Sequence, residues 1–233
     1  MFVQALKAEL TAIRLLFRNK FTLLLLVMIY GALLGAGYLF VSTREATISQ
    51  LILTLVLVVL APALFFALQA VSVNYVSGAS ATSLVKKTAY DSLRLVAVSV
   101  PLILVTALAV YGLGKINSHL TVVTAARYLL IGVIAPLLTI RLWVTASRDG
   151  LGPLLRRAPQ TAVKAFAPQA VFIYACGALI FAIAPYFLIS HSNQIERAWL
   201  EVSLLVVRLV VSAVLILFGW VTTVGTLSLL HKR

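Results

Sequence analysis

Six long apolar runs, separated by short polar segments, dominate this sequence. They cover approximately residues 21–41, 48–73, 95–113, 121–146, 168–189 and 199–230. A helix of about 20 apolar residues, rising 1.5 Å per residue, is long enough to cross a hydrocarbon layer of ~30 Å. Each run must be helical, because the layer holds no water to bond to the backbone. The sequence therefore predicts an all-α fold: a polytopic membrane protein with six transmembrane helices in a single membrane domain, residues 1–233.

The composition agrees with this fold class. The chain is 62% hydrophobic and only 11% charged, whereas a soluble domain carries about 25% charged residues. A net charge of +13 does not indicate nucleic acid as a partner, because the basic residues flank the apolar runs and no nucleic-acid-binding motif is present. Cys176, the single cysteine, lies inside an apolar run, so we expect a structural thiol.

The basic residues are unevenly divided between the two sides that six spans define. One side carries Lys7, Arg14, Arg18, Lys20, Lys86, Lys87, Arg94, Arg148, Arg156, Arg157, Lys164, Lys232 and Arg233. The other side carries Arg44, Lys115 and Arg197. By the positive-inside rule, this bias predicts a multi-pass protein with both termini in the cytoplasm. The absence of an Asn-x-Ser/Thr sequon favours a bacterial inner (plasma) membrane.

The stretch before the first run has an amphipathic pattern. In residues 2–20, Lys7, Arg14 and Arg18 share one helical face, and the face with Leu6 and Leu10 is apolar. Such a helix can lie in the membrane interface against anionic lipid. It can equally pack on the basic ends of the protein's own spans.

A similar plan recurs three times along the chain. Arg18, Lys87 and Arg157 stand 69 and 70 residues apart, each at the entrance to a pair of spans. We therefore predict internal repeats at 1–77, 78–150 and 151–233, each a basic interfacial segment followed by a helix pair. In the third copy, Pro159 and Pro168 favour two short interfacial turns over one helix.

A few polar residues within the spans are candidates for function or for helix contacts. Ionisable side chains are costly there, which singles out four residues: Arg127, Arg141, Glu201 and Arg208. Arg208 could instead pair with Glu201 or with backbone carbonyls and lock spans four and six together, and Arg141 is close enough to the span's end to snorkel. Gln69 is expected to make an interhelical hydrogen bond.

The basic entrances supply candidate contacts for anionic lipid head groups or for a partner subunit. These candidates are Arg14, Arg18, Lys86, Lys87, Arg156 and Arg157. Each Lys or Arg near an anionic surface contributes about 1 kcal/mol. In the first span, Gly31 and Gly35 form a G-x-x-x-G pair, which favours close approach of another helix.

No catalytic or metal-binding pattern emerges from the sequence. His119, His191 and His231 have no carboxylate or cysteine partner at metal-ligand spacing, and the acids lie at span ends or in loops. The usual nucleotide-binding and hydrolase motifs are absent. We therefore predict a protein that is not an enzyme and needs neither cofactor nor metal.

Two families resemble this chain. The opening, Leu6-Lys7-Ala8-Glu9-Leu10 through Leu16-Phe17-Arg18-Asn19-Lys20, resembles the elbow helix that begins ABC-2-type exporter permeases. That resemblance implies a coupling helix in residues 74–94 that touches a separate ATPase, although the third basic segment, 148–168, departs from the family. The overall plan of interfacial helix plus helix pair is similar to the membrane domain attached to some glycerophosphodiester phosphodiesterases, which implies architecture alone.

Three functions follow as alternatives. The first is a non-enzymatic membrane scaffold or accessory subunit that engages anionic lipid or partner subunits through its basic cytoplasmic face. The second is a permease subunit that exports a substrate with a separate ATPase. The third, disfavoured by the lack of clustered acid–base groups, is a lipid-modifying membrane enzyme.

Overall fold

The computed structural model describes residues 2–43, 47–78, 80–115, 121–190 and 198–231. These residues form helices and helical turns, with no strand among them. The elements are α1 (Phe2–Arg18), α2 (Lys20–Ser42), α3 (Ile48–Asn74), η1 (Tyr75–Ser77), α4 (Ala81–Lys115), α5 (Thr121–Leu129), η2 (Leu130–Ile134), α6 (Ala135–Asp149), α7 (Leu151–Arg156), α8 (Ala158–Ala165), α9 (Pro168–Ala178), η3 (Leu179–Ile183), α10 (Ala184–Ser190) and α11 (Ala198–Leu230).

Six helical segments are long and apolar enough to cross a membrane, which confirms the predicted fold class. They are Lys20–Ser42, Ile48–Ser77, Ala81–Lys115, Thr121–Asp149, Pro168–Ser190 and Trp199–Leu230. Five of them match the predicted apolar runs to within a few residues. Span three begins earlier than predicted, because residues 81–94 continue directly into it as one 35-residue helix. The basic segment 78–94 was therefore wrongly predicted to be a separate interfacial element.

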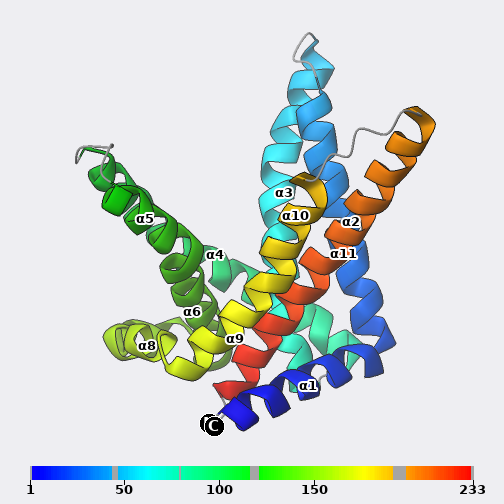
Figure 1. Cartoon of the computed structure of the whole chain (residues 1–233). Coiled ribbons are helices and arrows are strands. Elements are labelled where there is room, and N and C mark those ends of the chain that lie inside the picture. Colours follow the sequence, from blue (N-terminus) through cyan, green and yellow to red (C-terminus); the bar gives the residue numbers. More distant parts are fainter. Residues whose placement is uncertain (1, 44–46, 79, 116–120, 191–197, 232–233) are drawn as a thin grey trace.

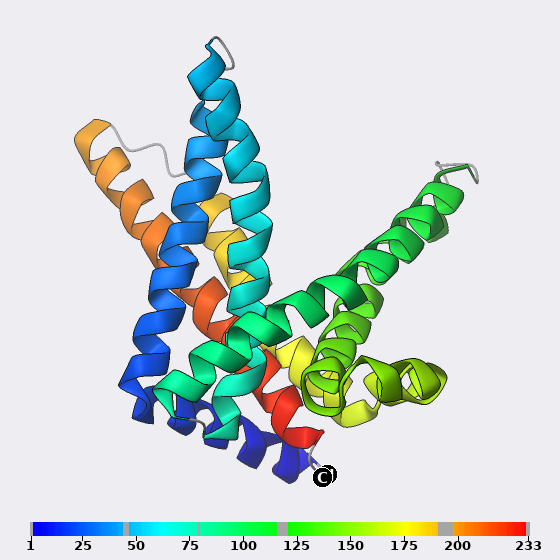
Figure 2. The same ribbon diagram turned by 180° about the vertical axis from the view of Figure 1, so that it is seen from behind.

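The spans are close together at one end and diverge toward the other (Figure 1). We call the first the basic end; it carries α1, α7, α8 and the C-terminal part of α11. We call the opposite end, where α2, α4 and α10 finish, the link end. In both views α5 lies on a separate arm from α2, α3 and α11 at the link end (Figure 2). Contacts between distant parts of the chain therefore concentrate near the basic end.

Helix α1 has three faces rather than the two that the sequence suggested. A row of small side chains, Ala5, Ala8 and Ala12, is buried, and α1 packs against α11. The predicted apolar face, which includes Leu6 and Leu10, is exposed. The basic face is also exposed. The helix thus packs on the protein's own helix ends, and its exposed apolar stripe is compatible with the other expected arrangement, against lipid, which stays a prediction.

Glycines in the left-handed conformation end two of the spans at the basic end. Gly78 has φ +69° after η1, and Gly150 has φ +84° after α6. Such angles are costly for residues with a Cβ. The third basic segment then forms the two short helices α7 and α8, as Pro159 and Pro168 predicted.

Two spans contain a turn of π-helix immediately before a proline. The segments are Leu130–Ile134 before Pro136 and Leu179–Ile183 before Pro185. Both read Leu-Ile-x-x-Ile-Ala-Pro, although the two spans run in opposite directions. Because Pro136 has no N–H for the Gly132 carbonyl four residues earlier, Tyr174 supplies the donor: its hydroxyl lies 2.7 Å from that oxygen.

Close helix packing is centred on α11 and not on the predicted G-x-x-x-G pair. A Cβ at Gly177 of α9 would overlap the Thr223 hydroxyl, and one at Gly225 would overlap the Tyr75 hydroxyl. In contrast, Cβ atoms at Gly31 and Gly35 would meet nothing within 4 Å in the described part of the chain. The expectation of a close helix contact at that pair is therefore wrong within the chain.

Three buried polar pairs join the helices. The Gln69 side chain accepts a hydrogen bond from the Trp220 indole at 2.6 Å, which confirms its predicted interhelical role. The Trp143 indole donates to Ser99 at 2.7 Å.

The third pair joins α3 to α4. Asn74 donates to the carboxylate of Asp91 at 2.7 Å, and both side chains are almost completely buried. The acids were expected at span ends or in loops; Asp91 lies within α4, and its carboxylate, paired with an amide, helps to join α4 to α3.

The threefold repeat stays a prediction. In the structure the three basic segments differ, because the first is one separate helix, the second is the start of α4, and the third is a pair of short helices. Spans two and four share similar sequences, Leu-Ala-Pro at Pro62 and Ile-Ala-Pro at Pro136, but the local structures differ. The helix α3 continues through Pro62 without a π turn.

Candidate functional site

Helix α6 is bordered by cavities on two different faces. One, which we call the basic cavity, lies near the basic end against α8, α9 and α11. The other, which we call the tryptophan cavity, lies against α2, α3 and α11. Because Leu137, Arg141 and Val144 face the first while Pro136, Thr139 and Trp143 face the second, α6 separates them.

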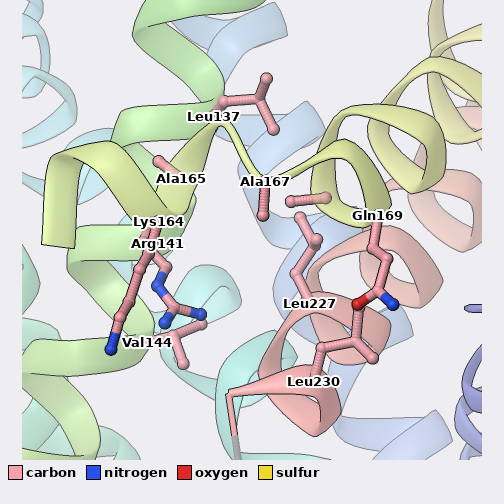
Figure 3. Close-up of a pocket in the computed structure, with 10 residues that line it drawn as sticks. Leu137, Arg141, Val144, Lys164, Ala165, Ala167, Gln169, Leu227 and Leu230 are labelled. Carbon is pink, nitrogen blue, oxygen red and sulfur yellow. The ribbon is translucent and has the colours of Figure 1, made fainter. Parts of the chain in front are cut away.

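The basic cavity consists of two compartments that share Arg141 and Lys164. The apolar compartment has a volume of about 150 Å³, and its walls include Leu137, Leu227 and Leu230. The polar compartment has a volume of about 100 Å³ and lies among α6, α7, α8 and His231. Figure 3 shows the Arg141 and Lys164 side chains running in the same direction on one side, with the Gln169 amide on the other.

Positive charge dominates the polar compartment. Arg141, Arg157, Lys164 and His231 line it, and among the described residues Asp149 is the one acid that does so. Buried nitrogens are also left without a hydrogen-bond partner in the described structure: Nε of Arg141 and Nδ1 of His231. An unpaired guanidinium donor such as Nε of Arg141 is costly, and an anion would satisfy it.

The neighbouring Arg148 is held in place from two other helices. Its guanidinium donates to Ser228 at 2.8 Å, and the Ser228 hydroxyl in turn donates to the Val73 carbonyl at 2.9 Å. This chain of bonds ties α6 to α11 and α3 behind the basic cavity. One nitrogen of Arg148, Nη1, remains without a described partner.

His231 borders the polar compartment just beyond the sixth span. Its Nε2 lies 3.5 Å from the Asp149 carboxylate, a contact that the sequence spacing of the two residues did not predict. Burial is the main cause that lowers the pKa of His231, and the nearby charges of Arg141 and Arg148 lower it further, while Asp149 opposes the shift. The imidazole is therefore held neutral at neutral pH.

The basic cavity has the chemistry of an amphiphile site. Guanidinium and ammonium groups recognise phosphate or carboxylate oxygens, and the adjoining leucine-lined compartment accommodates an apolar chain. Because Arg141 and Lys164 stand at the boundary between the two compartments, one ligand could use both. Of these residues, the sequence had singled out Arg141 and Arg157.

The tryptophan cavity has a volume of about 390 Å³ and an aromatic wall. Its aromatic side chains are Tyr30, Phe65, Trp143, Phe181 and Trp220. Both π-helical turns contribute to it, through Ile131 and Phe181. None of its described lining residues is charged.

The other basic candidates are spread over the basic end. Arg14, Arg18, Lys86 and Arg156 are exposed, and Lys87 is half-buried. None of them lines the basic cavity, in contrast to their neighbour Arg157. The structure thus brings one of the six predicted head-group contacts together with Arg141.

The remaining intramembrane candidates lie on different arms near the link end. Arg127 is half-buried on α5, where its guanidinium lies 3.0 Å from the position that a Cβ would take at Gly114 of α4. Glu201 is exposed and Arg208 is half-buried on α11. Since α5 and this half of α11 diverge (Figure 1), the structure does not bring Arg127 to Arg208. Spans four and six meet instead through α6, which packs against α11.

Several residues of the basic cavity were not predicted, among them Lys164, Gln169 and His231. They are separated along the chain and converge only after α8 and α9 fold against α6. Lys164 stands four residues after Gln160, which also lines the cavity, and that helical spacing was the available signal.

The described residues contain no group of three or more His, Cys, Asp or Glu that could hold a metal ion. The stretch 74–94, expected as a coupling helix from the permease resemblance, forms the end of α3, the turn η1 and the first part of α4. No family model, no curated protein and no solved structure matches this chain.

Proposed function

We propose that this protein is a non-enzymatic integral membrane protein that binds an anionic amphiphile, such as an acidic phospholipid, in the basic cavity. The observation that carries the proposal is the junction of a cationic and an apolar compartment at Arg141 and Lys164. The role is that of a lipid-binding scaffold or accessory subunit.

The proposed orientation places the basic end in the cytoplasm of a bacterial plasma membrane. Support comes from the excess of Lys and Arg at that end. Anionic lipids make the cytoplasmic leaflet surface negative, so the basic cavity would open where its ligand is abundant. The exposed basic and apolar faces of α1 would lie against the same leaflet.

In this proposal each side chain has a distinct task. The Arg141 guanidinium and the Lys164 ammonium donate hydrogen bonds to the head-group phosphate. Arg157 lines the same compartment and adds to the positive potential, while the neutral His231 borders it. Leu137, Leu227 and Leu230 contact the first methylenes of the chain.

The test is to titrate purified protein with phosphatidylglycerol or phosphatidylcholine and to count bound lipids by native mass spectrometry. A hydrogen bond to a charged group contributes about 1.5–3 kcal/mol, equivalent to about 10- to 100-fold in affinity. We therefore expect Arg141→Gln and Lys164→Gln each to weaken the tightest phosphatidylglycerol site by about this factor. Phosphatidylcholine should bind that site weakly in every variant.

Arg156→Gln is the matched control, since Arg156 is exposed and adjacent to Arg157 without lining the cavity. It should change the tightest site by less than threefold. The Lys86→Glu, Lys87→Glu double variant should weaken total lipid retention without removing the tightest site. Equal losses in Arg156→Gln and Arg141→Gln would contradict the proposal, and a stoichiometrically co-purifying ATPase would support the permease alternative instead.

A further inference from the structure

The tryptophan cavity lies at mid-depth in the spans, on the face of α6 away from the basic cavity. Ala135, which lines it, is midway along the fourth span, Thr121–Asp149. Its position next to both π-helical turns is notable because π turns in helices are frequent at functional sites. Water is scarce at this depth, so the occupant must come from the bilayer or from another protein.

Three polar groups around this cavity are already hydrogen-bonded within the protein. The indole N–H of Trp143 is engaged by Ser99, and that of Trp220 by Gln69. The Gly132 carbonyl, left without a backbone donor by Pro136, is engaged by Tyr174. Apart from the Tyr30 hydroxyl, what remains to contact an occupant is mainly aromatic and aliphatic surface.

A second hollow continues from this cavity to the lipid-facing surface. It has a volume of about 550 Å³ and lies between α4 and the η2–α6 segment. Ile131, Ala135 and Thr139 line both hollows. We call this second hollow the lateral groove. On its α4 side, Ile103 and Tyr111 are 60% and 64% exposed, so the groove is open to the membrane interior.

We propose that the tryptophan cavity binds one hydrocarbon chain of a membrane lipid, which enters from the bilayer along the lateral groove past Ala135 and Thr139. Three observations support a hydrocarbon occupant: an uncharged lining, two indole N–H groups that are already bonded, and a mouth on the lipid-facing side. The aromatic rings provide large contact areas at little entropic cost. This site is separate from the basic cavity, and neither proposal depends on the other.

The two tryptophans make the proposal testable by fluorescence. The chain has three tryptophans, so Trp199→Phe with Trp220→Phe leaves Trp143 as the single emitter. Because Trp220 lines the cavity and bonds to Gln69, the Trp199→Phe single variant, which keeps that bond, should be quenched in the same way. Trp143 is only 3% exposed, which shields it from lipid around the protein. In bilayers of phosphatidylcholine with brominated acyl chains, we expect its emission to fall to half or less of that in unbrominated bilayers.

Filling the path should remove this quenching. Ala135→Phe places a ring between the lateral groove and the cavity, and we expect at least 80% of the lost emission to return. Ala125→Phe is the matched control, because Ala125 is exposed on α5; it should leave quenching unchanged. If Ala135→Phe fails to fold, Thr139→Leu narrows the same passage.

Two results would overturn the proposal. One is Trp143 emission that is equal in brominated and unbrominated bilayers, as for a cavity that is empty or filled by a protein helix. The other is quenching that persists unchanged in both Ala135→Phe and Thr139→Leu, which would place the bromine outside the cavity. Neither result would bear on the basic cavity, which is tested separately by the lipid counts of the Arg141→Gln variant.

Discussion

The basic cavity and the tryptophan cavity border the same helix but have opposite chemistry. Around the first, α6 presents Arg141 beside Lys164 of α8; around the second, it presents Pro136 and Trp143. One lies at the basic end, where charged groups reach water and head groups, and the other lies at mid-depth, where they would be costly. The comparison teaches that depth in the membrane decides which side chains a single helix can offer.

The two cavities should therefore respond to different changes. The basic cavity depends on charge, so salt, pH and charge-removing substitutions should affect its ligand. The tryptophan cavity depends on shape and on the bonds that hold its walls. Besides α6, they share α11, which contributes Leu227 to one and Trp220 to the other.

The largest effect is expected where this shared support is broken. Gly177→Val would force a side chain into Thr223 of α11; overpacking typically costs about 1–3 kcal/mol, and an overlap with the Thr223 hydroxyl should lie at the upper end of that range. We expect the apparent Tm in detergent to fall by roughly 10 °C and both lipid-binding readouts to weaken. Gly35→Val is the control, since its Cβ has open space. An equal loss in Gly35→Val would show that α9–α11 packing is not the shared support.

A smaller effect should be confined to the tryptophan cavity. Tyr174→Phe removes the donor to the Gly132 carbonyl, which should cost about 1 kcal/mol and lower the apparent Tm by about 2–4 °C. In a Pro136→Ala background the loss should be less, because residue 136 then has its own N–H for that carbonyl. Additive losses in this double-mutant cycle would contradict the assignment, and phosphatidylglycerol affinity should stay within twofold throughout.

The smallest effect should be confined to the basic cavity and should depend on pH. Burial lowers the pKa of His231, so in the unfolded chain this histidine takes up a proton near pH 6.5 but in the ligand-free fold only at lower pH. Its contribution to the free energy of unfolding is thus fully present above pH 6.5 and is lost as the pH falls through the lowered pKa. A bound anion favours the protonated form of His231. The added positive charge contributes about 1 kcal/mol to binding, so the affinity for phosphatidylglycerol should rise about fivefold as the pH is lowered from 7.5 to 5.

The control for this prediction is His231→Gln, which should flatten the affinity profile over that range. The charges that act on the pKa of His231 are those of Arg141, Arg148 and Asp149, and Arg157 and Lys164 line the same compartment; the two arginines that act on it remain charged throughout. A profile that is equally steep in His231→Gln would assign the pH dependence to another group.

The spans were predictable from the sequence, because membrane burial requires long apolar helices regardless of their neighbours. The helix break at Pro168 and the bond made by Gln69 followed from local rules for proline and for buried amides. The close contacts did not, because G-x-x-x-G identifies small residues without identifying a partner: Gly31 and Gly35 face open space, whereas Gly177 meets α11.

The basic cavity was predictable only in part. Arg141 stood out as a charge inside a span, but Lys164 was one of many basic residues outside the spans, and its meeting with Arg141 depends on how α8 folds back. His231 and Asp149 are far apart in the sequence and adjacent in space. Such convergence is a tertiary property that residue spacing does not encode.

The most direct measurement is a cryo-electron microscopy structure of the wild-type protein in nanodiscs of phosphatidylglycerol and phosphatidylcholine. Our account predicts head-group density between the Arg141 guanidinium and the Lys164 ammonium, with chain density running along Leu137 and Leu227. A basic cavity without lipid density, together with ordered acidic lipid bound elsewhere, such as at the exposed arginines of α1, would contradict it.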